Sequence, residues 1–418
     1  MSEFLQNREY KQEILKKLIR DLHSGQDPQK VKENFRELIK DLSAAEISMM
    51  EEQLIAEGLP REEVRELCDV HVEIFREALD RNKDPESIPG HPVYTLRHEN
   101  REAESILNHL DRLFSEMKSS EQNKALASYI TLLKDKLLEL KEIEKHYLKK
   151  ENILFPYLER HNITGPPSVM WSVDDQIRAG LKNLIEKAEN WEKDLQAFSI
   201  EEVERQYNEV KKQISDMFYK EEKILVPMLL DILSNQEWAE IKIQDEEFGP
   251  VFSPPPKGPW APDLKEEAKE TPVPSPVQQA ADQKLPLQTG YLTLEQVNLM
   301  LKHLPIDVTF VDENDTVQYF SKGKERIFTR TDAIIGRKVQ NCHPPASVHV
   351  VEKILTDFKT GKHDTAEFWI QMKGMFIHIR YFAVRDEQGR YKGTLEVSQD
   401  ITNIRKLEGE RRLLHYDD

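Results

Sequence analysis

The chain has 418 residues, which at roughly 150 residues per domain predicts two to four domains. Its 59 lysines and arginines against 76 aspartates and glutamates give a net charge of −17, which argues against a nucleic-acid-binding surface. No stretch approaches the roughly 20 apolar residues of a membrane span, the first residues do not form a signal peptide, and the two cysteines give no disulfide framework. We therefore expect a cytoplasmic protein of several modules, and peripheral association with a membrane stays open.

Residues 1–85 show the 3.6-residue period of amphipathic helices, and we expect an all-α N-terminal domain of three or four helices. Cys68 and His71 lie three residues apart, a spacing that suits a metal or redox pair. Without other soft ligands, a buried thiol beside a partly exposed imidazole is the favoured interpretation, so we assign this domain no chemistry. A break with three prolines and a glycine follows, between Asp84 and Pro92.

A second helical block covers residues 91–235. Its apolar stripes predict four long helices, the first over 92–118 and the second over 121–160, and the short loops predict an up-down-up-down bundle. The ends of the second and fourth helices carry nearly the same sequence, KENILFPYL at 150–158 and KEEKILVPMLL at 220–230.

The repeat makes this block resemble the hemerythrin-like domains, which repeat His-x-x-x-Glu followed by Leu-Phe-Pro on helices two and four. Those domains add one histidine on each of helices one and three. The resemblance implies two irons held between the four helices. The spacing suits such a site because residues i and i+4 lie one above the other on a helix face.

Only two of the six usual ligands are present at matching positions, His146 on the second helix and Glu221 on the fourth. The i+4 partner of His146 is Lys150, with Glu151 one step further round the helix. The remaining imidazole positions are taken by Asn100, Asp174 and Met217. We therefore do not expect an ordinary oxygen-carrying diiron site.

Two interpretations of the bundle interior stay open. Buried ionised carboxylates are costly unless they are paired or bound to a metal. The candidate ligands of a hard cation such as iron are His146, Glu151, Asp174 and Glu221. In the other interpretation, which the missing imidazoles favour, Lys150 or fraying toward solvent satisfies the acids and no metal is bound.

Ten of the 22 prolines fall between Phe248 and Leu287. Proline-rich segments favour extended polyproline conformations, so we expect residues 249–289 to form a semi-rigid linker. After it, residues 290–418 change to short β-branched and aromatic runs between turn signals, which are typical of strands.

The order of elements in this last block is two strands, small helices, three antiparallel strands and a charged helix. The strands are predicted over 306–311, 317–321, 365–372, 376–385 and 393–399. With the closing Asp-Ile-Thr at 400–402 and a charged helix over Arg405–Leu414, this order resembles a PAS domain. The resemblance implies an α+β fold with a five-stranded antiparallel sheet.

The PAS resemblance gives two candidate ligand contacts. Cys342 and His343 lie between two helices, on the side where PAS domains usually enclose small molecules, so they are candidates to bind haem or another small ligand. In the alternative interpretation the two following prolines shape a loop and His343 is a surface donor. The run Asn-Cys-His-Pro-Pro lacks the Asn-Cys-Arg-Phe of flavin photosensors, so we do not expect light sensing.

The order of the three modules resembles a bacterial multidomain family whose function is not established. It implies a cytosolic sensory or regulatory protein that detects a small ligand, redox or metal signal and passes it to a separate signalling effector. Two alternatives stay open: a non-haem iron protein for oxygen, nitric oxide or iron-cluster repair, and an adaptor without a cofactor. No P-loop, dinucleotide or hydrolase motif appears, which favours a non-enzyme.

The charged helix over Arg405–Leu414 also bears on oligomeric state. It carries leucines beside a dense run of charges, and so short a helix is marginal unless it packs against something. We therefore predict a homodimer through the PAS domain and this helix, or docking of the helix on an effector. A frayed, solvated tail is the alternative.

Overall fold

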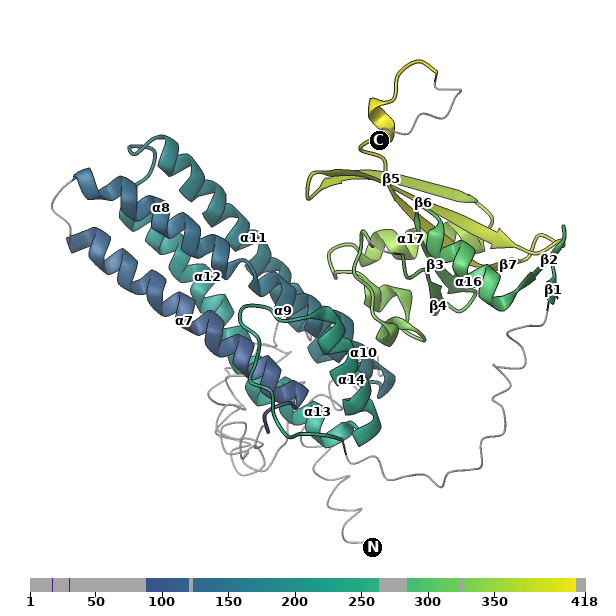
Figure 1. Cartoon of the computed structure of the whole chain (residues 1–418), viewed down its shortest axis with the longest axis horizontal. Coiled ribbons are helices and arrows are strands. Elements are labelled where there is room, and N and C mark those ends of the chain that lie inside the picture. Colours follow the sequence, from purple (N-terminus) through teal and green to yellow (C-terminus); the bar gives the residue numbers. More distant parts are fainter. Residues whose placement is uncertain are drawn as a thin grey trace, which may run out of the picture. The chain divides into compact units, whose positions relative to one another are not determined.

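The computed structural model describes residues 88–119, 123–262, 284–323 and 326–410, together with the isolated residues 17 and 30 (Figure 1). The chain divides into two compact units, residues 1–264 and 265–418, and each is described by itself. The helices expected over residues 1–85, with Cys68 and His71, lie outside the described residues.

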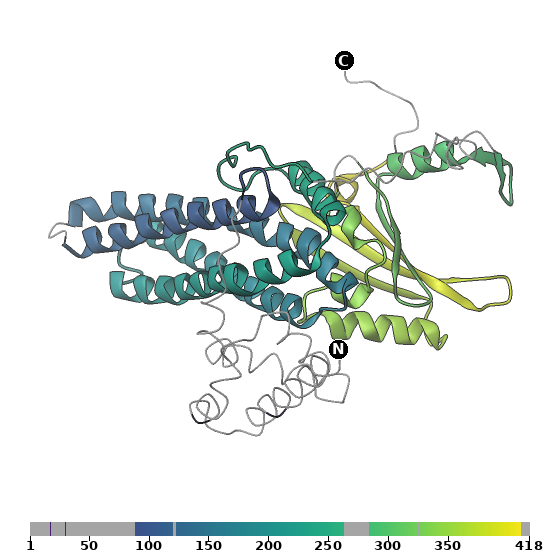
Figure 2. The ribbon, with the colours of Figure 1, turned by 90° about the horizontal axis from the view of Figure 1, so that it is seen from below.

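The first unit contains a bundle of long helices that run alongside one another (Figures 1 and 2). In chain order the helices are α7 (Pro92–Ser119), α8 (Asn123–Leu140), α9 (Ile143–Lys149), α10 (Phe155–Arg160), α11 (Gly165–Lys193), α12 (Ile200–Lys220), α13 (Val226–Ile232) and α14 (Asn235–Phe248). The segments α8 to α10 correspond to the predicted second helix, and α12 with α13 to the fourth. Apolar residues at helical spacing fill the core, as Leu107, Leu110 and Phe114 of α7 show by exposures of at most 2%. The predicted four-helix bundle is confirmed.

The second and fourth helices each contain one π-helical turn within the repeated sequence. These turns are η1 (Lys150–Leu154) and η2 (Glu221–Leu225), and Pro156 and Pro227 follow them. Proline has no N–H to donate along the helix, and the ladder here shifts to bonds over five residues, as from Phe155 to the carbonyl of Lys150. The repeat in the sequence is therefore a repeat in backbone geometry.

An additional layer covers part of α7. It consists of α14 and of residues 249–262, which we call the strap. The ring of His91 lies between Trp238 and Trp260, with 4.5 Å from its centroid to each indole ring. Burial, with a smaller effect from a nearby lysine, lowers the pKa of His91 to about 4, so the ring is neutral where it packs. These contacts attach the end of the strap to the start of the bundle.

For residues 249–262 the strap corrects the expectation of a semi-rigid linker over 249–289, and residues 263–283 lie outside the described residues. Val251 within it is only 6% exposed, and a Cβ atom on Gly258 would lie 1.9 Å from the carbonyl oxygen of Pro89. The segment is packed because apolar and aromatic side chains between its prolines find partners on the bundle. The bundle unit therefore extends beyond residue 235, and the last residues of the expected linker belong to a strand pair, β1 (Lys284–Pro286) with β2 (Tyr291–Thr293).

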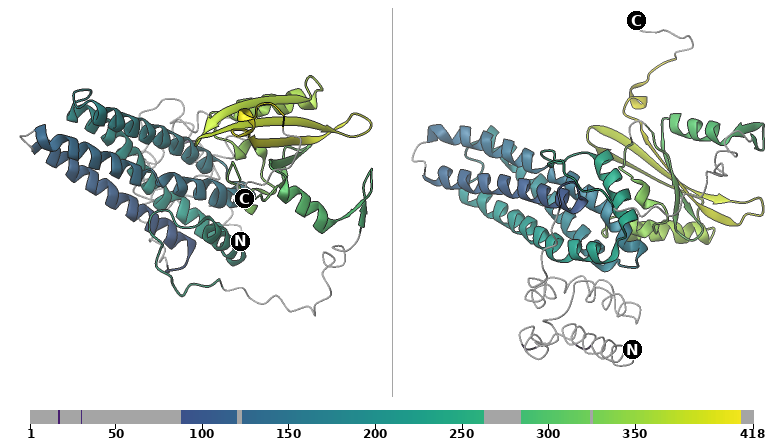
Figure 3. Two further views of the ribbon diagram at one scale, coloured as in Figure 1. Left: turned by 45° about the horizontal axis from the view of Figure 1, so that its top comes forward. Right: turned by 60° about the horizontal axis from the view of Figure 1, so that its bottom comes forward.

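The second unit contains a five-stranded antiparallel sheet in the order β4-β3-β7-β6-β5. Its strands are β3 (Asp307–Asp312), β4 (Val317–Phe320), β5 (Thr365–Met372), β6 (Met375–Arg385) and β7 (Tyr391–Asp400), close to the predicted ranges. The helix α16 (Leu294–His303) precedes the sheet, and the short helices η3 (Asp332–Ile334) and η4 (Val339–Cys342) and the helix α17 (Val348–Lys359) lie between β4 and β5. Figures 2 and 3 show α17 along one face of the twisted sheet.

An apolar cluster joins these short helices to the sheet. It consists of Val311, Val317, Phe320, Ile334, Val339, Cys342 and Leu355, with Val351 packed against them. The cluster identifies the face of β3 that carries Val311 as the inner face of the sheet, because side chains alternate between the two faces of a strand. The predicted α+β fold with a five-stranded antiparallel sheet is confirmed.

The prediction of a charged helix over Arg405–Leu414 is wrong for residues 405–410, which the structure describes. The chain forms only one 3₁₀ turn, η5 (Ile404–Lys406), and Leu407 is 77% exposed. Gly409 adopts φ = +66°, a left-handed conformation that ends a helix. Without a buried face, so short a segment does not keep helical hydrogen bonds. Residues 411–414 lie outside the described residues, and the homodimer stays a prediction.

We expect limited proteolysis of the full chain to leave the strap on the bundle, so that the N-terminal fragment retains Trp260. Trp260→Ala removes one wall around His91, and cleavage should then also occur within 249–262. Mass spectrometry of the fragments measures the cut sites. Trp369→Ala, at a 63% exposed position on β5, is the control that should leave the strap protected. Ready cleavage of the unaltered chain within 249–262 would contradict this arrangement.

Candidate functional site

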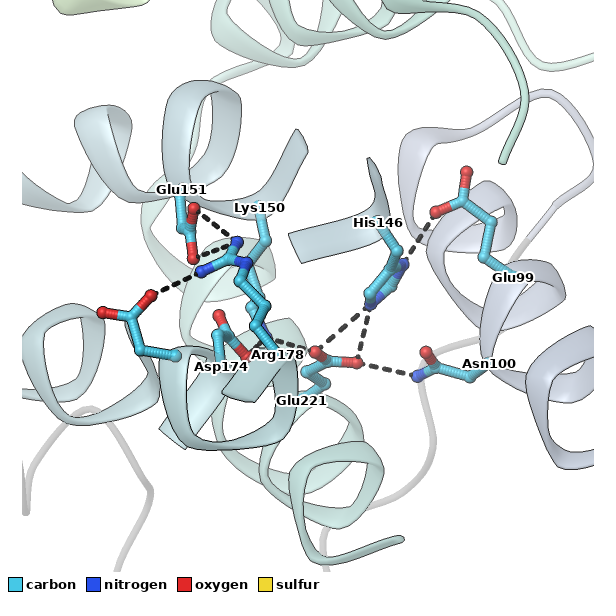
Figure 4. Close-up of polar contacts among 9 residues, drawn as sticks. Glu99, Asn100, His146, Lys150, Glu151, Asp174, Arg178 and Glu221 are labelled. Carbon is cyan, nitrogen blue, oxygen red and sulfur yellow. Dashed lines mark hydrogen bonds and ion pairs between the residues drawn. The ribbon is translucent and has the colours of Figure 1, made fainter. Parts of the chain in front are cut away.

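Charged side chains gather at the centre of the bundle (Figure 4). They come from α7, α9, η1, α11 and η2, and each is at most 3% exposed. The group consists of Glu99, His146, Lys150, Glu151, Asp174 and Glu221. Such burial costs several kcal/mol for each unpaired ion, so the partners of these groups decide what the site can do.

The Lys150 ammonium lies between carboxylates of two other helices. Its Nζ donates to Oδ1 of Asp174 at 2.9 Å and to Oε1 of Glu221 at 2.5 Å. The ring of Tyr147 lies 4.7 Å from the same nitrogen, a cation–π distance. Burial alone would lower the pKa of Lys150, but the two carboxylates raise it above its usual value. The lysine is therefore charged inside the protein.

His146 bridges two carboxylates. Its Nδ1 lies 2.7 Å from Oε2 of Glu99, and its Nε2 lies 3.2 Å from both oxygens of Glu221. Burial opposes the charged ring, but Glu221 and Glu99 together raise the pKa of His146 to about 9. At neutral pH the imidazolium donates from both nitrogens.

Glu221 receives hydrogen bonds from three directions. Asn100 Nδ2 donates to its Oε2 at 2.9 Å, in addition to the bonds from His146 and Lys150. Burial would raise the pKa of Glu221, but Lys150 and His146 lower it to about 2. The carboxylate thus connects η2 with α7, α9 and η1.

A chain of ion pairs leads from this centre toward α14. Lys149 Nζ lies 2.7 Å from Oε1 of Glu99 and 2.6 Å from Oδ1 of Asp245. A cavity of about 20 Å³, room for about one water molecule, is lined in part by Glu99, His146, Lys149 and Asp245. The charges at the centre are therefore linked to the half-exposed end of α14.

Glu151 does not join the other candidate ligands. Its two oxygens accept from Nη2 of Arg178 at 2.8 and 2.9 Å, and Nη1 of the same arginine binds Asp175 at 2.8 Å. Burial, partly opposed by Arg178, raises the pKa of Glu151 to about 8. Of the four predicted ligands the structure brings together His146, Asp174 and Glu221, and it holds Asp174 and Glu221 through Lys150.

Four members of the network are not predicted from the sequence: Glu99, Lys149, Arg178 and Asp245. A signal existed for one of them, since Arg178 follows Asp174 at i+4 and hence lies on its face of the helix. The sequence contains no such signal for Asp245, because α14 lies beyond the predicted bundle.

The donor set does not fit the metal that the hemerythrin-like fold implies. A metal needs deprotonated ligands with free lone pairs. Here both nitrogens of His146 face carboxylates, and the ammonium of Lys150 stands between Asp174 and Glu221. In the part of the chain that the structure describes, no three His, Cys, Asp or Glu side chains are grouped to hold a metal ion. The contacts agree with the interpretation in which Lys150 satisfies the acids.

The two PAS candidates have different surroundings. Cys342 is 7% exposed within the apolar cluster, with its Sγ 3.6 Å from the carbonyl oxygen of Lys338. His343 is half-buried, and its Nδ1 donates to the carbonyl of Val339 at 2.8 Å, which leaves Nε2 as an acceptor. Burial lowers the pKa of His343, so the ring is neutral. His343 is thus a candidate ligand contact, whereas Cys342 is a core residue.

The inner face of the sheet carries a row of polar side chains across three strands. Thr309 pairs with Glu396, and Glu396 pairs with Tyr381, so the three share the face of Val311. In addition to the effect of burial, Glu396 raises and Arg330 lowers the pKa of both His343 and Tyr381. Within the described residues, the side chains of Arg330, Tyr381 and Glu396 form no hydrogen bond or ion pair.

Comparisons with known families agree with the two folds. Three family models match successive parts of the chain: a family of unknown function (DUF438) over residues 15–81, the hemerythrin HHE cation binding domain over 91–229, and a PAS domain over 297–402. The described units are thus a hemerythrin-type bundle and a PAS domain. The chain joins parts that match these three models in this order, and the hemerythrin and PAS parts support a sensory or signalling role.

Solved structures similar to the chain match about a quarter to a third of it. A C-terminal domain from Streptococcus mutans is 37% identical and covers 31% of this chain and 99% of its own, with a TM-score of 0.30. A PAS domain from Colwellia psychrerythraea is 19% identical and covers 26% and 98%, with a TM-score of 0.22. No curated protein matches the chain. Among the described helices, none is long and apolar enough to cross a membrane.

We expect the bundle to be less stable at pH 9 than at pH 6.5. Folding raises the pKa of His146 from 6.5 to about 9, so its stabilising contribution is complete below pH 6.5 and is lost as the pH rises through 9. The raised pKa of Glu151 acts in the same direction, because its folded form also binds a proton more tightly. Thermal unfolding followed by helical circular dichroism should show the lower midpoint at pH 9.

His146→Gln is the matched variant for this measurement. It should reduce the difference between the two midpoints, because glutamine retains polar contacts but does not titrate. Exposed His109 offers the control, since His109→Gln removes an imidazole outside the network. An equal or higher midpoint at pH 9 in the unaltered chain would contradict the charge assignment.

Proposed function

We propose that the chain is a cytosolic sensory protein whose PAS domain binds a small polar molecule and signals to a separate effector protein. The observation that carries this proposal is a set of half-buried polar side chains that form no hydrogen bond or ion pair within the described residues, Tyr381 and Glu396 on the inner face of the sheet and Arg330 in the loop before η3. Side chains of this kind are normally paired within the protein, with water or with a ligand.

The chemistry of the set suggests the class of ligand. Arg330 suits an acidic group, Glu396 suits a donor or a cation, and the Nε2 of His343 accepts a hydrogen bond. The phenol of Tyr381 adds a group that donates and accepts. A small molecule with both an acidic group and an amine or other donor would satisfy these side chains together.

The other candidates have less support. For haem, Cys342 lies within the apolar cluster and only His343 remains as an axial ligand. For a non-haem iron protein, the carboxylates that would bind iron are already paired with Lys150 and His146. An adaptor without a cofactor corresponds to the result in which no ligand is found.

The test is a thermal-shift screen of the full chain against amino acids, their phosphorylated derivatives and small carboxylates. A ligand of the proposed class should raise the unfolding midpoint of the PAS domain. Glu396→Gln should weaken its binding by about tenfold or more, the usual effect of losing a charged hydrogen bond. Native mass spectrometry gives a second measurement of bound ligand.

Glu367→Gln is the matched control, because Glu367 pairs with Arg380 on the opposite face of the same sheet. It should bind the ligand as the unaltered chain does. A ligand that binds Glu396→Gln and the unaltered chain equally well would contradict the proposed site. The absence of any binding across the screen would favour the adaptor.

A further inference from the structure

We propose that Lys150 is the resident cation of the hemerythrin-type bundle and takes the structural place of a bound metal. The inference concerns the bundle alone and holds whether or not the PAS domain binds a ligand. It rests on the position of one ammonium group, on the charges around it and on the internal repeat of the sequence.

The ammonium joins three helices in the way a metal joins its ligands. Lys150 itself comes from η1, while its partners Asp174 and Glu221 come from α11 and η2. All three side chains are 0% exposed. Figure 4 shows Lys150 reaching down toward these two carboxylates. Because an ammonium has three donors and a positive charge, it can bond and neutralise acids from opposite sides at once.

The internal repeat shows that Lys150 stands at the position equivalent to Glu221. Pro156 and Pro227 are equivalent positions, separated by 227 − 156 = 71 residues, and Lys150 and Glu221 have the same separation. Lys150 and Glu221 each begin a π turn. Equivalent positions of the two repeats thus carry opposite charges, and they bind each other at 2.5 Å. A position suited to a second acidic ligand instead supplies its own counter-ion.

The ammonium of Lys150 occupies the position between Asp174 and Glu221 where a metal ion shared by these two carboxylates would lie. Four carboxylates, those of Glu99, Asp174, Glu221 and Asp245, surround the ring of His146 and the ammonium groups of Lys149 and Lys150. A metal ion held by Asp174 and Glu221 would lie beside the Lys150 ammonium in a region of low dielectric, where repulsion between like charges is strong. Metal binding would require Lys150 to leave.

The first test removes the ammonium. Lys150→Ala leaves Asp174 and Glu221 without their common cation, and the equilibrium constant for unfolding of the full chain should rise by about a hundredfold or more. Lys187→Ala is the control, since Lys187 forms a partly exposed pair with Glu202 and its loss should change stability little. A Lys150→Ala chain as stable as the unaltered one would overturn the proposal.

The second test replaces the lost cation from solution. Propylammonium matches the side-chain atoms that Lys150→Ala removes, and Mn²⁺ tests the same carboxylates as metal ligands. Both should raise the unfolding midpoint of Lys150→Ala and leave that of the unaltered chain unchanged.

A third test uses the unaltered chain and therefore does not depend on whether Lys150→Ala folds. Titration with Mn²⁺ and with Fe²⁺ under anaerobic conditions, followed by metal analysis after desalting, should leave far less than one ion per chain. Retention of one or more ions per chain with a raised midpoint would overturn the proposal. Failure of both propylammonium and Mn²⁺ to stabilise a folded Lys150→Ala chain would do the same.

Discussion

An ionised carboxylate with no exposed surface needs cations and hydrogen-bond donors around it, and Glu221 obtains them from three segments of the bundle. Asn100 comes from α7, His146 from α9 and Lys150 from η1. Each of these partners is itself buried, and two of them hold a further carboxylate, since His146 contacts Glu99 and Lys150 contacts Asp174. The packing of the helices at this level is therefore tied to the protonation and charge of one side chain.

The backbone of the bundle also helps to position the buried charged residues. Two prolines at equivalent places in the repeat are preceded by π turns, and these turns begin at Lys150 and Glu221. A π turn inserts one residue into the helical repeat and changes which side chains face inward. The two halves of the repeat thus share one backbone geometry, while the side chains at the centre form an ion-pair network.

The PAS sheet shows a comparable division between scaffold and chemistry. One part of its inner face packs an apolar cluster against the short helices, and Cys342 belongs to that cluster. The neighbouring part carries Thr309, Tyr381 and Glu396 at successive paired positions across three strands. Strand pairing alone brings these polar groups together, because directly paired residues point to the same side of a sheet.

The sequence by itself determined the helices of the bundle, the strands of the five-stranded sheet and the inward position of His146, Asp174 and Glu221, because hydrophobic periodicity and turn residues act locally. It did not determine the partners of the buried charges. Glu151 faces Arg178 rather than His146, and the strap packs on the bundle although its prolines predict an extended linker. Only the tertiary structure decided these contacts. The partner of a buried charge depends on how the helices pack and on which side chains the packing brings within bonding distance.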